Sequence, residues 1–170
     1  MEFTKVVTER FSCKKFDGRK ISEKELNVIL EAGRLAPTAK NLQPQHIYVA
    51  DSNEAVAKID KHTVCRYNAP TVLVVAYKDD NLYKYPGDKY DSGVEDATII
   101  ATHMLLAAFN EGVSACYLNR FDPDALKAEL GLPEDEHIVC LIDLGYADKG
   151  VKPLPPHMSR KPLSETVTRI

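Results

Sequence analysis

The chain has 170 residues and a formal net charge of −3, which fits a single domain over residues 1–170. A domain of this size buries about 70% of its unfolded surface, so it folds without disulfides or metals. The mildly acidic charge offers no basic surface for nucleic acid, and no apolar run of about 18 residues is present to span a membrane. The four cysteines are far apart in sequence, which indicates reduced thiols and a cytoplasmic protein.

The first predicted elements are a short helix over residues 3–9 and a basic segment after it. The run Arg10-Phe-Ser-Cys-Lys-Lys-Phe16 holds three cations and a hydroxyl. Alternate residues of an extended segment share one side, so Arg10, Ser12 and Lys14 would face together. A guanidinium, a hydroxyl and an ammonium on one side can hold a phosphate by charge-assisted hydrogen bonds. The alternative is a solvated basic turn.

A helix and a polar loop follow. Ser22 and Glu25 have the spacing of a capping box, which predicts a helix as far as about residue 35. The loop over residues 36–44 is bounded by prolines and carries three neutral polar side chains, which are Thr38, Asn41 and Gln43. Such groups suit a ring with amide-like edges, although a plain turn accounts for them equally well.

The middle of the chain contains two predicted strands. Residues 46–50 alternate in polarity, and the apolar run over residues 71–77 predicts a buried strand. A helix over residues 53–61 is expected between them. The polar segment 79–90 is rich in tyrosine, and its length indicates either a functional lid or a loose excursion.

Residues 91–113 form the longest predicted helix and organise the domain. Ser92 is expected to cap its start, and Gly112 is expected to end it. The apolar residues of one broad face recur at helical spacing: Val94, Ala97, Ile100, Ala101, Met104, Leu105, Ala108 and Phe109. Further apolar residues lie on the opposite face, so we expect other parts of the protein to pack on this helix from more than one side. We therefore expect the hub of a dimer, the alternative being the core helix of a monomer.

The last third contains strands over residues 114–119 and 138–144, with a helix over residues 124–130 between them. The tail over residues 149–170 contains four prolines and cannot form one continuous helix. Because the tail has no core of its own, it must lie across the domain or a neighbouring subunit, or be disordered.

Several familiar motifs are missing. The eight glycines form neither G-x-G-x-x-G nor a P-loop, so side chains would have to hold any nucleotide phosphate. The five histidines lack ligand spacing, which predicts no metal site. Cys13 adjoins Lys14 and Lys15, whose charges could lower the pKa of the thiol, so a reactive cysteine is a minor hypothesis.

Taken in order, these segments resemble the nitroreductase family of FMN-dependent oxidoreductases. Each motif is weak alone, but their order and spacing cover nearly the whole chain. The resemblance is carried by the following segments: Arg10–Phe16, Ala36–Pro44, residues 91–113, Cys116–Asp122, Leu130–Pro133, Leu144–Tyr146 and Arg160–Leu163.

The resemblance implies an α+β fold in which helices flank a central, mostly antiparallel sheet. It also implies an intertwined homodimer with FMN sites at the interface and an extended C-terminal tail that embraces the partner. No catalytic side chain is implied, because flavin N5 carries the chemistry. The residues implied in cofactor binding are Arg10, Phe11, Ser12, Cys13, Lys14, Pro37, Thr38, Ala39, Asn41, Gln43, Tyr117, Leu118, Asn119, Arg160 and Lys161.

In the family pattern, Arg10, Ser12 and Arg160 would hold the phosphate and ribityl chain. Lys14 would reach the phosphate or the pyrimidine edge of the ring. The polar loop would come from the other subunit, and residues 117–119 would line the opposite ring edge.

Two departures from the pattern bear on the substrate. Lys14 stands where arginine is frequent, which keeps the charge but loses the bidentate fork. Gln45 stands where tryptophan is common, which removes one apolar wall.

The reaction implied is hydride transfer from NADH or NADPH through the flavin to an electron-poor small molecule, such as a nitroaromatic or a quinone, in a ping-pong cycle. One alternative is a flavoenzyme with another donor or acceptor, such as ferredoxin. Another is a flavin-binding or interaction module without turnover.

Overall fold

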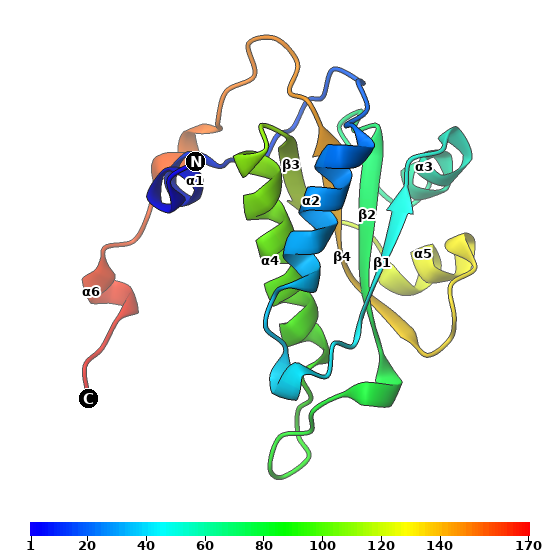
Figure 1. The fold of residues 1–170 in the computed structure, drawn as a ribbon, viewed down its shortest axis with the longest axis vertical. Helices are drawn as coiled ribbons and strands as arrows, with labels where there is room; N and C mark the ends of the chain where they lie inside the picture. Colours follow the sequence, from blue (N-terminus) through cyan, green and yellow to red (C-terminus); the bar gives the residue numbers. More distant parts are fainter.

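The computed structural model describes residues 1–170, and it contains a four-stranded antiparallel sheet with helices on both faces (Figure 1). The strands are β1 (Gln45–Ala50), β2 (Thr71–Lys78), β3 (Ser114–Leu118) and β4 (Glu136–Gly145). The α-helices are α1 (Phe3–Glu9), α2 (Glu23–Arg34), α3 (Asn53–Asp60), α4 (Gly93–Asn110), α5 (Pro123–Leu130) and α6 (Leu163–Thr166). The predicted α+β fold with an antiparallel sheet is confirmed.

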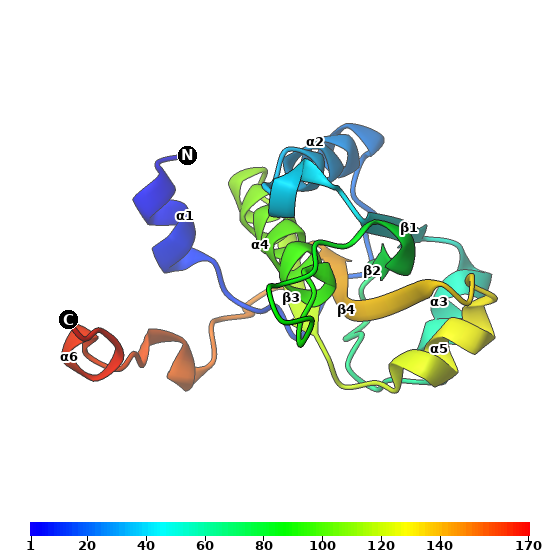
Figure 2. The ribbon, with the colours of Figure 1, turned by 90° about the horizontal axis from the view of Figure 1, so that it is seen from below.

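The strand order is β1-β2-β4-β3, so β2 and β4 are the inner strands. Helices α2 and α4 cover one face of the sheet, and α3 and α5 cover the other (Figure 2). Along β2, Leu73 and Val75 enter the core under α2 and α4, whereas Val72 and Val74 enter the core under α3 and α5. This burial on both faces explains why β2 reads as a continuous apolar run.

Helix α2 begins as predicted and packs closely on α4. The Ser22 side chain accepts from the Glu25 backbone N–H, and the Glu25 carboxylate accepts from the Ser22 N–H. Gly33 then lets the two helices approach, because a Cβ built there would lie 2.8 Å from Met104 Cγ. Ala97 and Ala101 of α4 are fully buried in the same core.

The start of α4 differs from the prediction. The Asp91 carboxylate accepts from the Gly93 N–H at 3.1 Å, whereas the Ser92 hydroxyl makes no capping bond and instead accepts from the Tyr83 N–H at 3.2 Å. Ser92 is therefore used to hold the preceding loop. Val94, predicted to be in the core, is 57% exposed. Helical spacing placed it correctly on the apolar face, but this chain covers the first turn only on the side of Gly93 and Asp96, which are buried, and leaves Val94 open.

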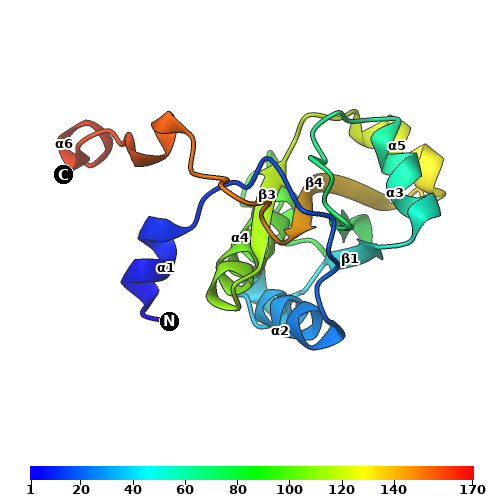
Figure 3. The same ribbon diagram turned by 90° about the horizontal axis from the view of Figure 1, so that it is seen from above.

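The two ends of the chain lie outside the helix–sheet core (Figures 1 and 3). Helix α1 and the tail, with the short 3-10 turn η3 (Pro155–Met158) and α6, extend to the same side of the domain. Both segments expose large apolar side chains, which are Met1, Phe3, Val7, Leu154, Met158, Leu163, Val167 and Ile170. None of the helices combines the length and hydrophobicity needed to cross a bilayer.

Candidate functional site

The basic segment runs in an extended conformation beside β3, and we call residues 10–16 the arm. Ser12 pairs with Ala115 in a parallel bridge, and the Cys13 N–H donates to the Ala115 carbonyl at 2.9 Å. Cys13 is buried, whereas Ser12 and Lys14 are exposed on the other side of the arm. The predicted alternation therefore presents a hydroxyl and an ammonium together.

The cations of the arm differ in their partners. Lys15 forms an ion pair with Asp148 at 2.7 Å, which occupies its charge. Arg10 and Lys14 take part in none of the chain's ion pairs, and the Lys14 Nζ lies 6.0 Å from the centroid of the Tyr67 ring. Two cations near one hydroxyl are thus available for an external anion.

The tail returns to the arm at η3. Phe11, Ser12 and Lys14 line a hollow of about 350 Å³ whose other wall is Leu154, Pro156 and His157. The rings of Phe11 and His157 meet edge to face, with centroids 6.3 Å apart. This contact joins two segments that are separated by nearly the whole sequence.

The two cations expected from the tail lie just beyond this hollow. Arg160 Nη1 donates to the carbonyls of His157 at 2.5 Å and Ser159 at 2.8 Å, so the guanidinium is turned onto the tail's own backbone. Lys161 is exposed. Within this chain, neither side chain is held against the arm.

The end of β3 presents three expected residues in different ways. The Tyr117 side chain packs on the α4 face, and burial together with its Cys140 neighbour raises the pKa of the phenol to about 12. The Leu118 side chain is buried in the opposite core, so only its backbone is available to a ligand. Asn119 is exposed and donates to the Val139 carbonyl at 3.3 Å.

The polar loop, residues 36–44, is a tight turn with an unusual backbone. Lys40, Asn41 and Gln43 all have positive φ angles of 51–57°, a region that L residues enter at a cost. The Thr38 hydroxyl accepts from the Gln43 N–H at 3.1 Å, which leaves its own proton free to donate. Pro37, Asn41 and Gln43 are exposed. The loop thus presents neutral donors and acceptors outward.

Two side chains from distant elements hold this loop. Asp96 of α4 is 1% exposed, and its Oδ1 accepts from the Ala39 N–H at 2.8 Å. Its Oδ2 is buried and has no hydrogen-bond partner. Asn81, in the short turn η2 (Asp79–Asn81), donates to the Leu42 carbonyl at 2.7 Å. Sequence reasoning missed this role of Asp96, because no local signal points to a partner 57 residues away.

The tyrosine segment is anchored at its base, whereas its tip over residues 86–90 is exposed, with Tyr90 at 72%. Lys84 and Asp91 form an antiparallel bridge at its base, and the Tyr83 and Tyr85 rings lie 5.6 Å apart. Lys40 of the polar loop lies over the Tyr83 ring at 4.7 Å. The segment therefore borders the polar loop at the start of α4.

The arm and the polar loop lie at opposite ends of α4 (Figure 1). The polar loop is tied to Asp96 in the first turn, whereas the arm pairs with Ala115, a few residues after the helix ends at Asn110. From Asp96 to Ala108 the helix rises about 18 Å, at 1.5 Å per residue. One chain therefore brings together the arm, the start of β3 and the tail, but it leaves the polar loop at the far end.

The hypothesis of a reactive Cys13 thiol is wrong in this fold. The side chain is fully buried, and burial raises the pKa of the thiol above its ordinary value. The thiol donates to the Lys15 carbonyl at 3.2 Å. The neighbouring lysine charges, which motivated the hypothesis, point into solvent on the exposed side of the arm or pair with Asp148.

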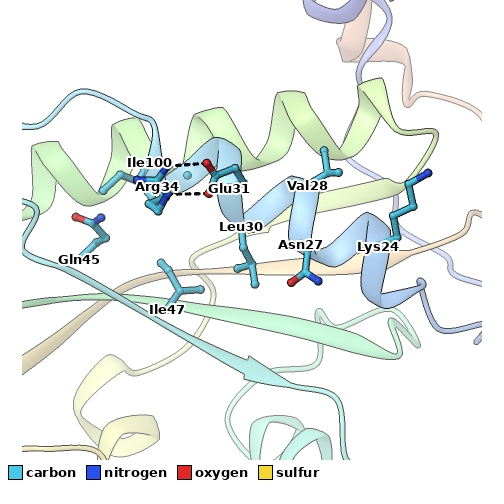
Figure 4. A pocket seen from close by; sticks show the side chains of 10 residues that line it. Lys24, Asn27, Val28, Leu30, Glu31, Arg34, Gln45, Ile47 and Ile100 are labelled. Carbon is cyan, nitrogen blue, oxygen red and sulfur yellow. Dashed lines mark hydrogen bonds and ion pairs between the residues drawn. The ribbon is translucent and has the colours of Figure 1, made fainter.

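A broad hollow of about 1040 Å³ lies elsewhere, along α2 beside the edge strand β1 (Figure 4). Leu30, Ile47 and Ile100 form its apolar part, and Gln45 lies at one end with its Oε1 buried and unpartnered. None of the expected cofactor-binding residues lines it. Its size therefore does not mark the site that the sequence predicts.

Comparison with known proteins agrees with the motifs. The model of the nitroreductase family matches residues 7–67 and 66–146 of this chain. A protein of Archaeoglobus fulgidus, named as an NADH dehydrogenase/NAD(P)H nitroreductase, is 31% identical over 151 residues, which are 85% of this chain and 85% of that protein.

Two crystal structures share the fold. A nitroreductase family protein from Clostridium difficile 630 is 30% identical, has a TM-score of 0.92, and matches over 99% of this chain and 98% of its own. A nitroreductase from Exiguobacterium sibiricum in complex with FMN is 20% identical, with a TM-score of 0.87 over 100% of this chain and 98% of its own. The chain belongs to the nitroreductase family, as the order of its sequence motifs predicted.

Proposed function

We propose that the protein is an FMN-dependent oxidoreductase that passes a hydride from NADH or NADPH, through flavin N5, to an electron-poor small molecule such as a nitroaromatic or a quinone, in a ping-pong cycle. Family membership supports the reaction class. The FMN in the Exiguobacterium sibiricum structure and the NAD(P)H in the name of the Archaeoglobus fulgidus relative support the cofactor and the electron donor.

The observation that carries the proposal is the pair of cations without acidic partners on the arm. Arg10 and Lys14 would bind the FMN phosphate by charge-assisted hydrogen bonds, with the Ser12 hydroxyl between them. The adjacent hollow, walled by Phe11 and His157, is also lined by Ser12 and Lys14 and suits the ribityl chain. The missing glycine-rich loop is consistent with phosphate recognition by side chains.

The neutral edge of the ring requires the polar loop. The Thr38 hydroxyl and the Asn41 amide offer donors and acceptors but no charge, which fits a pyrimidine edge. Because this loop is tied to the start of α4 and the arm lies near the other end of that helix, the loop would come from a second copy of the chain. Tyr117, the Leu118 backbone and Asn119 would border the ring from the first copy.

A homodimer would also cover the apolar side chains that this chain leaves exposed. Helix α1 and the tail together expose eight large apolar residues, among them Phe3 at 70% and Leu163 at 77%. Exposed apolar surface of this extent on projecting segments favours burial against another protein surface. Packing of these segments on a partner would bring Arg160 and Lys161 to a cofactor site.

When bound, FMN supplies the redox chemistry, and the chain's own residues bind and orient it. Lys14 would place a positive charge near the phosphate or the pyrimidine edge, where negative charge is stabilised. No nucleophile is required, and the burial of Cys13 agrees with that absence.

The decisive experiment is the visible spectrum of the purified protein, followed by anaerobic titration with NADH and NADPH and by light scattering. A yellow dimer that bleaches with either nucleotide and recovers its colour with a quinone or a nitroaromatic is expected. If the flavin bleaches only with reduced ferredoxin, the electron donor is ferredoxin rather than NADH or NADPH. Flavin that binds but accepts no electrons would indicate a binding module. A colourless monomer that takes up no FMN would overturn the proposal.

A further inference from the structure

The polar loop adopts a strained conformation that its own bonds do not fully explain. Lys40, Asn41 and Gln43 lie in the left-handed region within four positions, which is unfavourable for L residues, although least so for asparagine, unless their surroundings impose it. The internal bonds are the Thr38–Gln43 bond and the donation from Gln43 Nε2 to the Asn41 carbonyl at 3.2 Å. These bonds span the turn but do not attach it to the domain.

Attachment to the domain depends on few groups. The backbone bond from the Lys78 N–H to the Pro44 carbonyl fixes the end of the loop, and Asn81 holds Leu42. At the start of the loop, the Ala39 N–H meets the carboxylate of Asp96. The donor and the acceptor come from segments that only tertiary packing brings together.

Burial of the Asp96 carboxylate at this position is energetically unfavourable. It is almost fully buried at the start of α4, beneath the loop, and one of its two oxygens has no partner. A buried acceptor without a donor destabilises a fold, because the hydrogen bonds it made to water in the unfolded chain are not replaced. The presence of a carboxylate at a position where one of its oxygens has no donor points to a role beyond folding.

We infer that Asp96 is a positioning residue for the flavin ring, which holds the polar loop so that Thr38 and Asn41 meet the ring edge. This inference rests on the proposed function. Because only Oδ1 makes the tether, a side chain with a single correctly placed acceptor can replace the carboxylate. Asp96 acts on the ring end of the ligand and has no contact with the arm that would hold the phosphate.

The test compares two flavins that differ only in the phosphate. FMN and riboflavin are titrated into the apoprotein of the parent, Asp96→Ala and Asp96→Asn, and dissociation constants are measured by fluorescence quenching. Asp96→Ala should weaken both flavins by the same factor, about tenfold, as loss of one positioning hydrogen bond would. Asp96→Asn should recover most of the affinity, because its amide oxygen accepts from Ala39.

A second variant removes the donor and leaves the carboxylate intact. Thr38 is extended, with φ −129° and ψ 157°, and Ala39 begins the short 3-10 turn η1 (Ala39–Asn41), so Ala39→Pro fits the backbone while deleting the N–H. It should weaken both flavins as Asp96→Ala does. Because it lies in a partly exposed loop, it tests the tether even where Asp96→Ala does not fold.

Asp122→Ala is the matched control. Asp122 also accepts from backbone N–H groups at a helix start, those of Asp124 and Ala125, but at α5 on the other face of the sheet. It should lower the melting temperature and leave both dissociation constants unchanged.

The outcomes separate the two claims. If the parent binds FMN and both Asp96→Ala and Ala39→Pro bind it equally well, the positioning role is overturned and the proposed function stands. Selective loss of FMN, with riboflavin unaffected, also overturns it, because the effect would then lie at the phosphate. A parent that takes up neither flavin overturns the role together with the proposed function.

Discussion

The two ends of α4 carry opposite kinds of recognition chemistry. At the C-terminal end, the arm presents two unpaired cations on a backbone that is fixed by pairing with β3. At the N-terminal end, the polar loop presents neutral groups on a strained backbone that depends on single tethers from Asp96 and Asn81. At the charged end, substitutions should therefore affect flavin binding mainly when they remove a charge. At the neutral end, substitutions should affect flavin binding when they disturb the backbone of the loop.

The largest effect is expected at the charged end. Arg10→Ala should weaken FMN binding by about 2–3 kcal/mol, because it removes a charge-assisted partner of the phosphate. Riboflavin binding should change little. The measurement is fluorescence titration with both flavins. Lys15→Ala is the control, since Lys15 is already paired with Asp148. Equal loss of both flavins in Arg10→Ala would break the distinction between the two ends.

The next largest effect is expected on the pH dependence of stability, which a buried carboxyl behind the arm controls. Asp143 of β4 faces Cys116 of β3; it is fully buried with both oxygens unpartnered, and burial raises its pKa to about 8. Since the unfolded carboxyl titrates near 4, the native state holds the extra proton between about pH 4 and pH 8, so stability should fall as the pH rises through this window.

Asp143→Asn removes that titration. It should flatten the dependence on pH and stabilise the protein at pH 8 by about 2 kcal/mol, which chemical denaturation at several pH values would measure. The dissociation constant for FMN should change little in Asp143→Asn, in contrast to Arg10→Ala. A pH slope that persists in Asp143→Asn would assign the titration to another group.

At the neutral end, a packing change should reduce stability. A Cβ on Gly93 would lie 2.4 Å from Tyr77 Cε2, inside van der Waals contact. Gly93→Ala should therefore destabilise the protein by about 1–2 kcal/mol and disturb the start of α4. Thermal unfolding measures the first effect. Gly112→Ala is the control for the steric clash. A Cβ there would contact nothing but φ is +78°, so this variant shows the effect of backbone conformation on stability without a clash.

The smallest effect is expected for a single neutral contact. Thr38→Ala should weaken FMN and riboflavin alike by about 1 kcal/mol, because one hydroxyl donor is lost and the Gln43 N–H is left without its acceptor. Thr38→Ser keeps the hydroxyl and should bind nearly as the parent does. If Thr38→Ala affects FMN alone, the assignment of the loop to the ring edge is incorrect.

The local signals in the sequence were reliable where the cause is local. The Ser22–Glu25 box, the apolar run of β2 and the left-handed Gly112 just after α4 each follow from neighbouring residues, and each is present in the fold. The Ser92 cap failed because the hydroxyl found a partner in the Tyr83 backbone instead. Val94 failed because the chain covers its helical turn only on the side of Gly93 and Asp96.

The sequence by itself determined the elements and the residue types available to a flavin, because caps, periodicity and turn residues act over a few positions. The antiparallel α+β class followed from the resemblance to the nitroreductase family. Tertiary structure alone decided that Cys13 is buried, that Asp96 holds a loop 57 residues away, and that the arm and the polar loop stand at opposite ends of one helix. Each of these depends on which distant segments pack together, and packing is set by the whole chain rather than by any stretch of it.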